Sequence, residues 1–568
     1  LRVTKGGEFN VTSKSISVSG AVQIGGTLTS QMELSNLNVL NSDSCDYFLT
    51  EDLIIPVGMS LTIKDGVKIC VAEGVSIISE GFLTIDGGVG VKIEALGNNW
   101  KGIHLKRGGA EIKGLTVEGA GSSSFTNDPS EKAGLYIETP NVQELTNSNF
   151  IDNDGYGVIM NKGVIINRYF ATYSNNTSGP AILSLEVHTA NQSGTQLSNV
   201  LPNTYLGLRG GSAGSVSLLN KGIPYLLYDD MSFTALQLLA GTEIYVKDTV
   251  GIFIDQNFIS QGNSSDPIII EGVTQAAGSW KGIQCNIASL KYTTIQYAGS
   301  APLKKGSFSQ TFEYNCGLMV NYNSCTLENS TISNNNGYGV ALYQLTNNPN
   351  SYKYVNNDIS NNSTGAVLVN AFNVSTITSD LLSSYSGYGS KPIITIHGEN
   401  SATLAMNTNP TNWRKLSAAV SSTDYKLLDG DYVVTQNGVL TIDQGVFIEC
   451  DANVKIEITS GSTLDAQGIN SEKIVFRGST GTPGFWDGIY ANTNSTLILD
   501  YVNIDHGGSG NGAYQGCLTV SSNVSTTSST VTNCAFLNGS VFDLFFNGVT
   551  DVLGIKDIAN NNTFVNSN

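Results

Sequence analysis

A cluster of basic side chains is the first candidate for chemistry in this sequence. Lys101, His104, Lys106 and Arg107 lie within one short segment. A lysine or arginine beside a bound uronate can abstract the proton α to its carboxylate, as a polysaccharide lyase requires. Lys101, Lys106 and Arg107 are therefore candidate catalytic residues, and His104 is a candidate ligand-binding residue. The alternative is a solvated edge that prevents strand-to-strand aggregation.

Two tyrosines offer a different activity, the stacking of aromatic rings on sugars. Tyr156 and Tyr338 occupy matching Gly-Tyr-Gly turns. Tyrosine combines a large apolar ring with a polar hydroxyl, so an exposed copy at a turn can contact a saccharide. We therefore take both as candidate ligand-binding residues. The alternative is that each ring packs on a neighbouring element of the structure.

Paired carboxylates suggest either glycoside hydrolysis or calcium binding. The pairs are Asp152 with Asp154, Asp229 with Asp230, and Asp429 with Asp431. Asp229 and Asp429 occupy matching positions in similar phrases, which favours a role in turns. No EF-hand loop is present, and no metal or other cofactor is expected, with calcium held by these turn carboxylates as the one alternative.

The eight cysteines do not form the C-x-x-C pairs typical of zinc sites. Cys45 and Cys70 are about one solenoid coil apart and could form a disulfide. The alternative for most of the cysteines is that they are small buried hydrophobic residues.

The elements that position these residues recur along the chain. The phrases Trp100-Lys101-Gly102-Ile103, Trp280-Lys281-Gly282-Ile283 and Trp486-Asp487-Gly488-Ile489 follow tyrosines that also match, Tyr47, Tyr225 and Tyr425. Such repetition predicts a solenoid. We predict modules at 47–224, 225–424 and 425–568, with 1–46 as N-terminal coils of the same continuous superhelix. A tryptophan repeated at one module position is more typical of a structural plug than of a sugar platform.

The local pattern is that of short strands and turns. Apolar residues alternate with polar ones over three to five positions, as in 59–69 and 438–448, and a glycine or Asp-x-Gly turn follows in most cases. The segments 145–160 and 327–342 share an Asn-rich phrase ending in Gly-Tyr-Gly-Val. Inward asparagines stacked coil upon coil would hydrogen-bond one another, as amide ladders do. The expected fold class is therefore an all-β parallel solenoid.

These phrases resemble the right-handed parallel β-helix, or pectate-lyase-like, superfamily, in the form common in secreted and surface proteins of Bacteroidetes-type bacteria. The resemblance covers 47–566 and rests on Y-x-L, L-T-I-x-x-G-V-x-I, W-x-G-I and N-x-x-I-x-N-N-x-G-Y-G-V. It implies a single-stranded right-handed β-helix and a secreted or cell-surface location. The superfamily includes lyases, hydrolases, epimerases and adhesins, so fold does not determine function.

Composition narrows the partners. The formal net charge is −18, whereas nucleic-acid binding requires a basic surface. A nucleic-acid partner is therefore not expected. No apolar segment is long enough to span a membrane as a helix.

We expect a non-catalytic β-helix that binds a glycan or another surface polymer. The alternatives are a polysaccharide lyase or hydrolase, and a stalk without a ligand. The insertions at 122–132 and 300–315 are expected to protrude from one side and to wall a groove.

Overall fold

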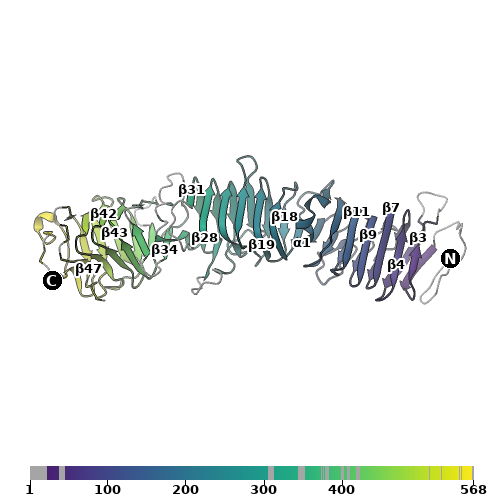
Figure 1. Ribbon diagram of the computed structural model, residues 1–568, viewed down its shortest axis with the longest axis horizontal. Coiled ribbons are helices and arrows are strands. Elements are labelled where there is room, and N and C mark those ends of the chain that lie inside the picture. Colours follow the sequence, from purple (N-terminus) through teal and green to yellow (C-terminus); the bar gives the residue numbers. More distant parts are fainter. Residues whose placement is uncertain are drawn as a thin grey trace. The chain divides into compact units, whose positions relative to one another are not determined.

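The computed structural model describes residues 22–37, 45–304, 313–342, 352–371, 374, 377, 383–397, 402–405, 410–417, 422–510, 512–522, 524–525, 528–548, 550–551 and 553–565. The chain divides into two compact units, Leu1–Phe253 and Ile254–Asn568. Each unit consists almost entirely of short strands that stack as successive coils (Figure 1). Nearly all strand pairs are parallel; β26 and β27 form an antiparallel exception. The predicted all-β parallel solenoid is confirmed, whereas the three module boundaries stay a prediction.

The elements of unit 1 are β1 (Val22–Thr27), β2 (Met32–Leu34), β3 (Tyr47–Ile55), β4 (Ser60–Lys64), β5 (Lys68–Val71), β6 (Ser76–Ser79), β7 (Phe82–Ala95), β8 (Gly102–Leu105), β9 (Gly109–Glu118), β10 (Ala133–Ile137), β11 (Val142–Ile151), β12 (Tyr156–Met160), β13 (Arg168–Ser174), β14 (Gly179–Ser184), α1 (Leu185–Ala190), a 3-10 helix (Gln192–Gly194), β15 (Thr195–Leu197), β16 (Leu206–Arg209), β17 (Ser212–Leu218), β18 (Tyr225–Leu227), β19 (Met231–Leu239) and β20 (Glu243–Val246).

The division between the units falls within β21 (Gly251–Ile254), and unit 2 continues with β22 (Asn257–Gln261), β23 (Ile268–Gly272), β24 (Gly282–Lys291), β25 (Thr293–Gln296), β26 (Leu303–Lys304), β27 (Glu313–Tyr314), β28 (Cys316–Glu328), β29 (Thr331–Ser333), β30 (Tyr338–Leu342), β31 (Tyr352–Val355), β32 (Asp358–Ser360), β33 (Gly365–Asn370), β34 (Ile394–His397), β35 (Ala402–Ala405), β36 (Thr411–Trp413), β37 (Tyr425–Leu427), β38 (Asp431–Val434), β39 (Val439–Ile442), β40 (Phe447–Cys450), β41 (Lys455–Ile458), β42 (Thr463–Gln467), β43 (Ile474–Gly478), β44 (Gly488–Ala491), β45 (Thr496–Asp500), β46 (Val502–Asp505), β47 (Gly516–Val520), β48 (Thr530–Thr532), β49 (Ala535–Leu537), β50 (Phe542–Phe546) and a 3-10 helix (Ile558–Asn560).

The core of unit 1 forms because alternate side chains of each strand point inward and align with those of the next coil. In one series of strands, Leu53 pairs with Ile77, Ile77 with Ile103, Ile103 with Leu135, and Leu135 with Val158. All five side chains are buried. Burying a large aliphatic side chain contributes about 1.5–3 kcal/mol, so such columns provide much of the driving force for folding.

Asparagine ladders complete the interior, as the sequence predicts. Asn153 donates from Nδ2 to Oδ1 of Asn176 at 2.8 Å, and its own Oδ1 accepts the Ala120 amide. Asn335 and Asn362 repeat the arrangement in unit 2, also at 2.8 Å. These side chains satisfy backbone groups at the turns, where an unpaired buried amide would be costly.

The three repeated tryptophans are structural plugs. Trp100, Trp280 and Trp486 are fully buried, and each indole N–H donates to a backbone carbonyl at 2.8–2.9 Å. The glycine two residues later also has a structural reason. At Gly102 φ is +123°, and a Cβ there would lie 2.4 Å from the carbonyl oxygen of Ala133. The W-x-G-I phrase is therefore scaffold, as predicted.

Cys45 and Cys70 form a disulfide between consecutive coils, with Cα atoms 5.8 Å apart. The other six cysteines are free and buried, consistent with their interpretation as small hydrophobic residues.

Candidate functional site

One sheet of unit 1 has both faces covered. Its strands β8, β10, β12 and β14 are buried along their entire length. The register aligns His104 with Tyr136, Tyr136 with Ile159 and Ile159 with Ile182 as a row that points out of the solenoid. Residues 122–132, here called the strap, lie over part of this row.

The strap contacts the sheet through Phe125, whose ring centroid is 4.9 Å from that of His104 and 6.1 Å from that of Tyr136. The expectation that this insertion protrudes to wall a groove is therefore wrong for 122–132. An apolar side chain within the insertion buries part of the apolar row beneath it. Half of the second insertion, residues 305–312 of 300–315, lies outside the described residues.

Three residues of the predicted basic cluster, His104, Lys101 and Lys106, have different partners. His104 is largely buried and its Nε2 lies 2.9 Å from Oε2 of Glu138. Burial lowers the pKa of His104, with the Glu138 carboxylate opposing. Lys101 places its ammonium 4.9 Å from the centroid of the Phe125 ring. Both side chains support the packing of the strap.

Lys106 and Arg107 are exposed beyond the end of β8. The Lys106 ammonium pairs with Glu80 at 3.0 Å. The pKa of the Glu80 carboxyl is lowered, first by this hydrogen bond and then by the charges of Lys106 and Arg107. These contacts match the solvated-edge alternative for Lys106, and no contact joins its ammonium to Lys101 or His104.

The two tyrosines proposed for sugar stacking are packed rather than exposed. Tyr156 and Tyr338 are each 7% exposed. The Tyr156 hydroxyl lies 2.9 Å from that of Tyr228, and the Tyr338 ring packs edge-on against Tyr314 at 5.9 Å. The interpretation as exposed corner platforms is wrong, because in both cases neighbouring side chains cover the ring.

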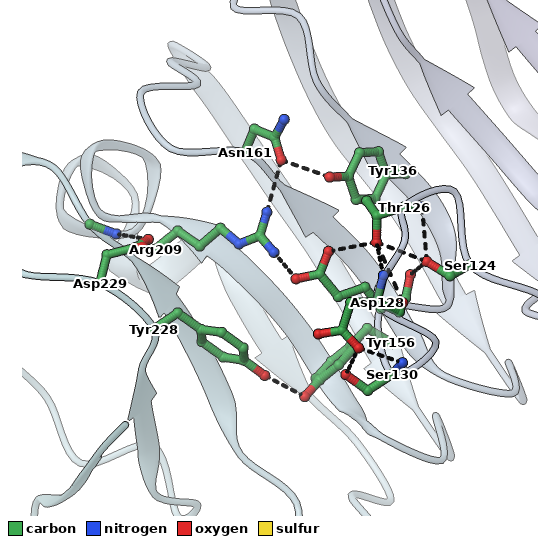
Figure 2. A network of polar contacts seen from close by, with 12 residues as sticks. Ser124, Thr126, Asp128, Ser130, Tyr136, Tyr156, Asn161, Arg209, Tyr228 and Asp229 are labelled. Atoms are coloured by element: carbon green, nitrogen blue, oxygen red, sulfur yellow. Dashed lines mark hydrogen bonds and ion pairs between the residues drawn. The ribbon is translucent and has the colours of Figure 1, made fainter. Parts of the chain in front are cut away.

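A polar network fixes the strap to a coil further along unit 1 (Figure 2). Arg209 donates to Glu131 of the strap and to Oδ1 of Asn161, the latter at 2.8 Å. The Tyr136 hydroxyl donates to the same Asn161 oxygen at 2.8 Å. The side chains of Arg209 and Glu131 are 14% and 12% exposed, so their ion pair is largely shielded from water.

Arg209 belongs to an outward face that sequence reasoning missed. In β16, β18 and β20 the register pairs Leu206 with Tyr225 and Tyr225 with Ile244, all of which point inward. The side chains between these inward residues therefore point outward and form rows across the three strands. The rows are Tyr205, Pro224 and Glu243; Gly207, Leu226 and Tyr245; and Arg209, Tyr228 and Lys247.

One end of this face is closed. Arg209 forms an ion pair with Glu131. The Lys247 ammonium lies 3.9 Å from the centroid of the Tyr228 ring and makes a cation–π contact with it. The Tyr228 ring lies over Gly207, where a Cβ would be 3.0 Å from its Cε2 atom. The glycine thus makes room for the ring, and little of this end is free for a ligand.

The other end is a groove of about 570 Å³, here called the Tyr205–Tyr245 groove. The two rings are half-buried, with centroids 5.4 Å apart and planes at 68°. The lining includes Pro202, Asn203, Lys221, Pro224 and Glu243. The lining is mainly polar, and the two aromatic rings and two prolines add apolar surface to it. From the sequence, the alternation of apolar and polar residues could have placed Tyr205 and Tyr245 on the outside of their strands. Bringing the two side chains together also required the register between coils.

Unit 2 has a second groove, of about 560 Å³. Its polar lining includes Lys415, Thr441, Asp443, Asp465, Gln467 and Glu472. The Lys415 ammonium forms an ion pair with the buried carboxylate of Asp424, at an N–O distance of 2.8 Å. No aromatic ring lines this groove, so it has no apolar platform of the kind found in unit 1.

Four of the six carboxylates in the predicted pairs have structural partners. Asp229 accepts the Gly210 amide at 3.0 Å and Asp230 accepts the Gly251 amide at 2.8 Å. Asp154 pairs with Lys132 and Asp431 with Lys455. Within the described residues, the one group of His, Cys, Asp or Glu donors close enough to share a metal is Cys45, Cys70 and Glu94. Both sulfurs there are in the disulfide, so the described chain offers no assembled calcium site of this type.

In the part of the chain that the structure describes, no helix has the length and hydrophobicity to cross a membrane. Comparison with protein-family models, with curated proteins and with solved structures found no match.

Proposed function

We propose that this protein is a non-catalytic β-helix of the pectate-lyase-like type, secreted or displayed on a cell surface, that binds glycan. The observation that carries the proposal is the Tyr205–Tyr245 groove, where two half-buried aromatic rings meet polar side chains on a rigid sheet. Sugar rings present apolar faces and polar edges, and such a lining complements both.

The rigidity of the groove favours binding. Tyr205 precedes β16 and Tyr245 lies within β20, and both strands are fixed by parallel pairing with β18. Side chains on a sheet lose less entropy on binding than side chains on a mobile loop, because the backbone is already ordered.

The lyase alternative rests on Lys101, Lys106 and Arg107, and the contacts above place Lys101 in strap packing and Lys106 in a surface ion pair. A proton-abstracting site needs its base and its carboxylate-binding groups around one reacting atom. Binding without catalysis is therefore the better-supported function.

The test is affinity for a panel of neutral and acidic polysaccharides, measured for the wild type, Tyr205→Ala and Tyr245→Ala. Each substitution should weaken binding about tenfold or more, equivalent to about 1.4 kcal/mol. Tyr490→Ala, which removes a half-buried tyrosine of unit 2, is the matched control and should bind as the wild type does. Equal affinities for all four proteins would refute the assignment of the groove as the binding site. Release of unsaturated or reducing ends from any substrate would show that the protein is an enzyme.

A further inference from the structure

The Tyr205–Tyr245 groove contains one carboxylate, Glu243, in a particular relation to the two rings. Glu243 and Tyr245 are two residues apart on β20 and point out of the same face. Tyr205 stands in the same row as Glu243, two coils away, across Pro224. Neighbouring strands are about 4.8 Å apart, so Tyr205 and Glu243 are separated by about 10 Å at the backbone. The carboxylate therefore lies along the platform formed by the rings.

In the part of the chain that the structure describes, this carboxylate has no partner of opposite charge. Among the described residues no basic side chain lies within 4.0 Å of Glu243. Other acids in unit 1 are paired, as Glu94 and Glu118 are with Lys92. An unpaired carboxylate beside two aromatic rings attracts a cation, because both the charge and the negative faces of the rings favour it.

Lys221, the other charged residue of the groove, is directed elsewhere. Its ammonium donates to the backbone carbonyls of Gln192 and Thr195, at 2.5 Å and 3.5 Å. Partial burial lowers the pKa of Lys221. Its charge is therefore partly offset by two carbonyl dipoles, whereas that of Glu243 faces the cavity with no counterion among the described residues. The net charge of −18 adds a long-range attraction for cations.

From this geometry we infer that the groove takes a glycan bearing a free, protonated amine, such as a chain of glucosamine units that are not N-acetylated. The inference rests on the proposed glycan-binding function and names its ligand class. The sugar rings would pack on Tyr205 and Tyr245, and the ammonium of one unit would lie against Glu243. N-acetylation removes that charge and leaves the rings in place, so the two forms separate charge recognition from stacking.

The experiment is calorimetric titration with the β-1,4-linked trisaccharide of glucosamine and with its fully N-acetylated counterpart, at a pH where the amines are protonated. The wild type should bind the amine form at least tenfold more tightly, with one site per chain. Glu243→Gln, a nearly isosteric change at a partly exposed position, should reduce the preference to less than threefold and leave binding of the acetylated form unchanged. Tyr205→Ala should weaken the binding of both forms.

Glu328→Gln is the matched control, since it removes one carboxylate from an ion pair with Lys353 in unit 2 and changes the net charge equally. It should retain the full preference. Tighter or equal binding of the acetylated form by the wild type would overturn the inference, and so would a preference that persists in Glu243→Gln. If neutral glycans bind and Tyr205→Ala abolishes that binding but no amine preference exists, the inference fails alone. If no glycan binds the wild type, the proposed function fails with it.

Discussion

A single buried histidine should make unit 1 sensitive to acid. His188 lies on α1, is 1% exposed, and has no hydrogen-bond partner at either ring nitrogen among the described residues. Its ring packs edge-on against Tyr225 at 5.4 Å. Burial, with the charge of Lys221, lowers its pKa from 6.5 to about 3.

The direction and size of the change in folding stability with pH follow from proton linkage. The folded state keeps His188 neutral, whereas in the unfolded chain it takes up a proton below pH 6.5. Stability is therefore complete above pH 6.5 and is lost progressively as the pH falls from 6.5 towards 3. At pH 5 the unfolded chain binds nearly one proton and the folded state almost none, so the loss is about 2 kcal/mol. Below pH 3 it levels off near 5 kcal/mol, at about 1.36 kcal/mol per pKa unit.

His188→Leu removes this titration while keeping an apolar side chain of similar size. Native-state hydrogen exchange should be compared for peptides spanning β14 and β16, with both proteins in the same buffer at pH 7.5 and pH 5. Between these pH values protection in the wild type should fall about 30-fold more than in the variant, the equivalent of about 2 kcal/mol. Equal changes in the two proteins would show that His188 is protonated without penalty in the folded state, and the argument from burial would be refuted.

Three further predictions concern the scaffold. Trp280→Ala should lower the free energy of unfolding by about 3–5 kcal/mol in urea denaturation, because it empties a fully buried site; unchanged stability together with lost glycan binding would instead make it a sugar platform. Asn335→Ala should cost about 1–3 kcal/mol in the same assay, since the buried Ala298 amide loses its acceptor, and Asn98→Ala, which removes an exposed side-chain hydrogen bond to Glu73, is the control that should cost much less. Reducing the Cys45–Cys70 disulfide, which links positions 25 apart, should destabilise the first coils of unit 1 by about 3.5 kcal/mol from loop entropy; proteolysis between these residues that is unaffected by reductant would contradict this.

Much of the scaffold could be predicted from the sequence because it depends on local patterns that repeat. Alternation, glycine turns and recurring asparagines each report on one coil, and each coil resembles the next. Trp100 and Asn153 accordingly lie where the repeats place them. The disulfide followed from a spacing of about one coil.

The site could not be predicted in the same way, because it depends on register between coils and on what covers each face. Tyr156 has the sequence context of an exposed turn, yet Tyr228 from a distant coil covers it. Tyr205 carries no motif, and it joins Tyr245 and Glu243 only once the strands are aligned. The contact of the strap with Arg209 spans 78 residues, and no local pattern indicates it.

The disulfide has a mechanical consequence. Parallel coils are held to one another by backbone hydrogen bonds, which tension along a solenoid axis would load a few at a time. Cys45 and Cys70 add a covalent bond to the hydrogen bonds between two neighbouring coils of unit 1. Under load, the chain between Cys45 and Cys70 should therefore be withheld from extension while the disulfide is intact and released after reduction, so that the redox state changes the length to which unit 1 can be pulled.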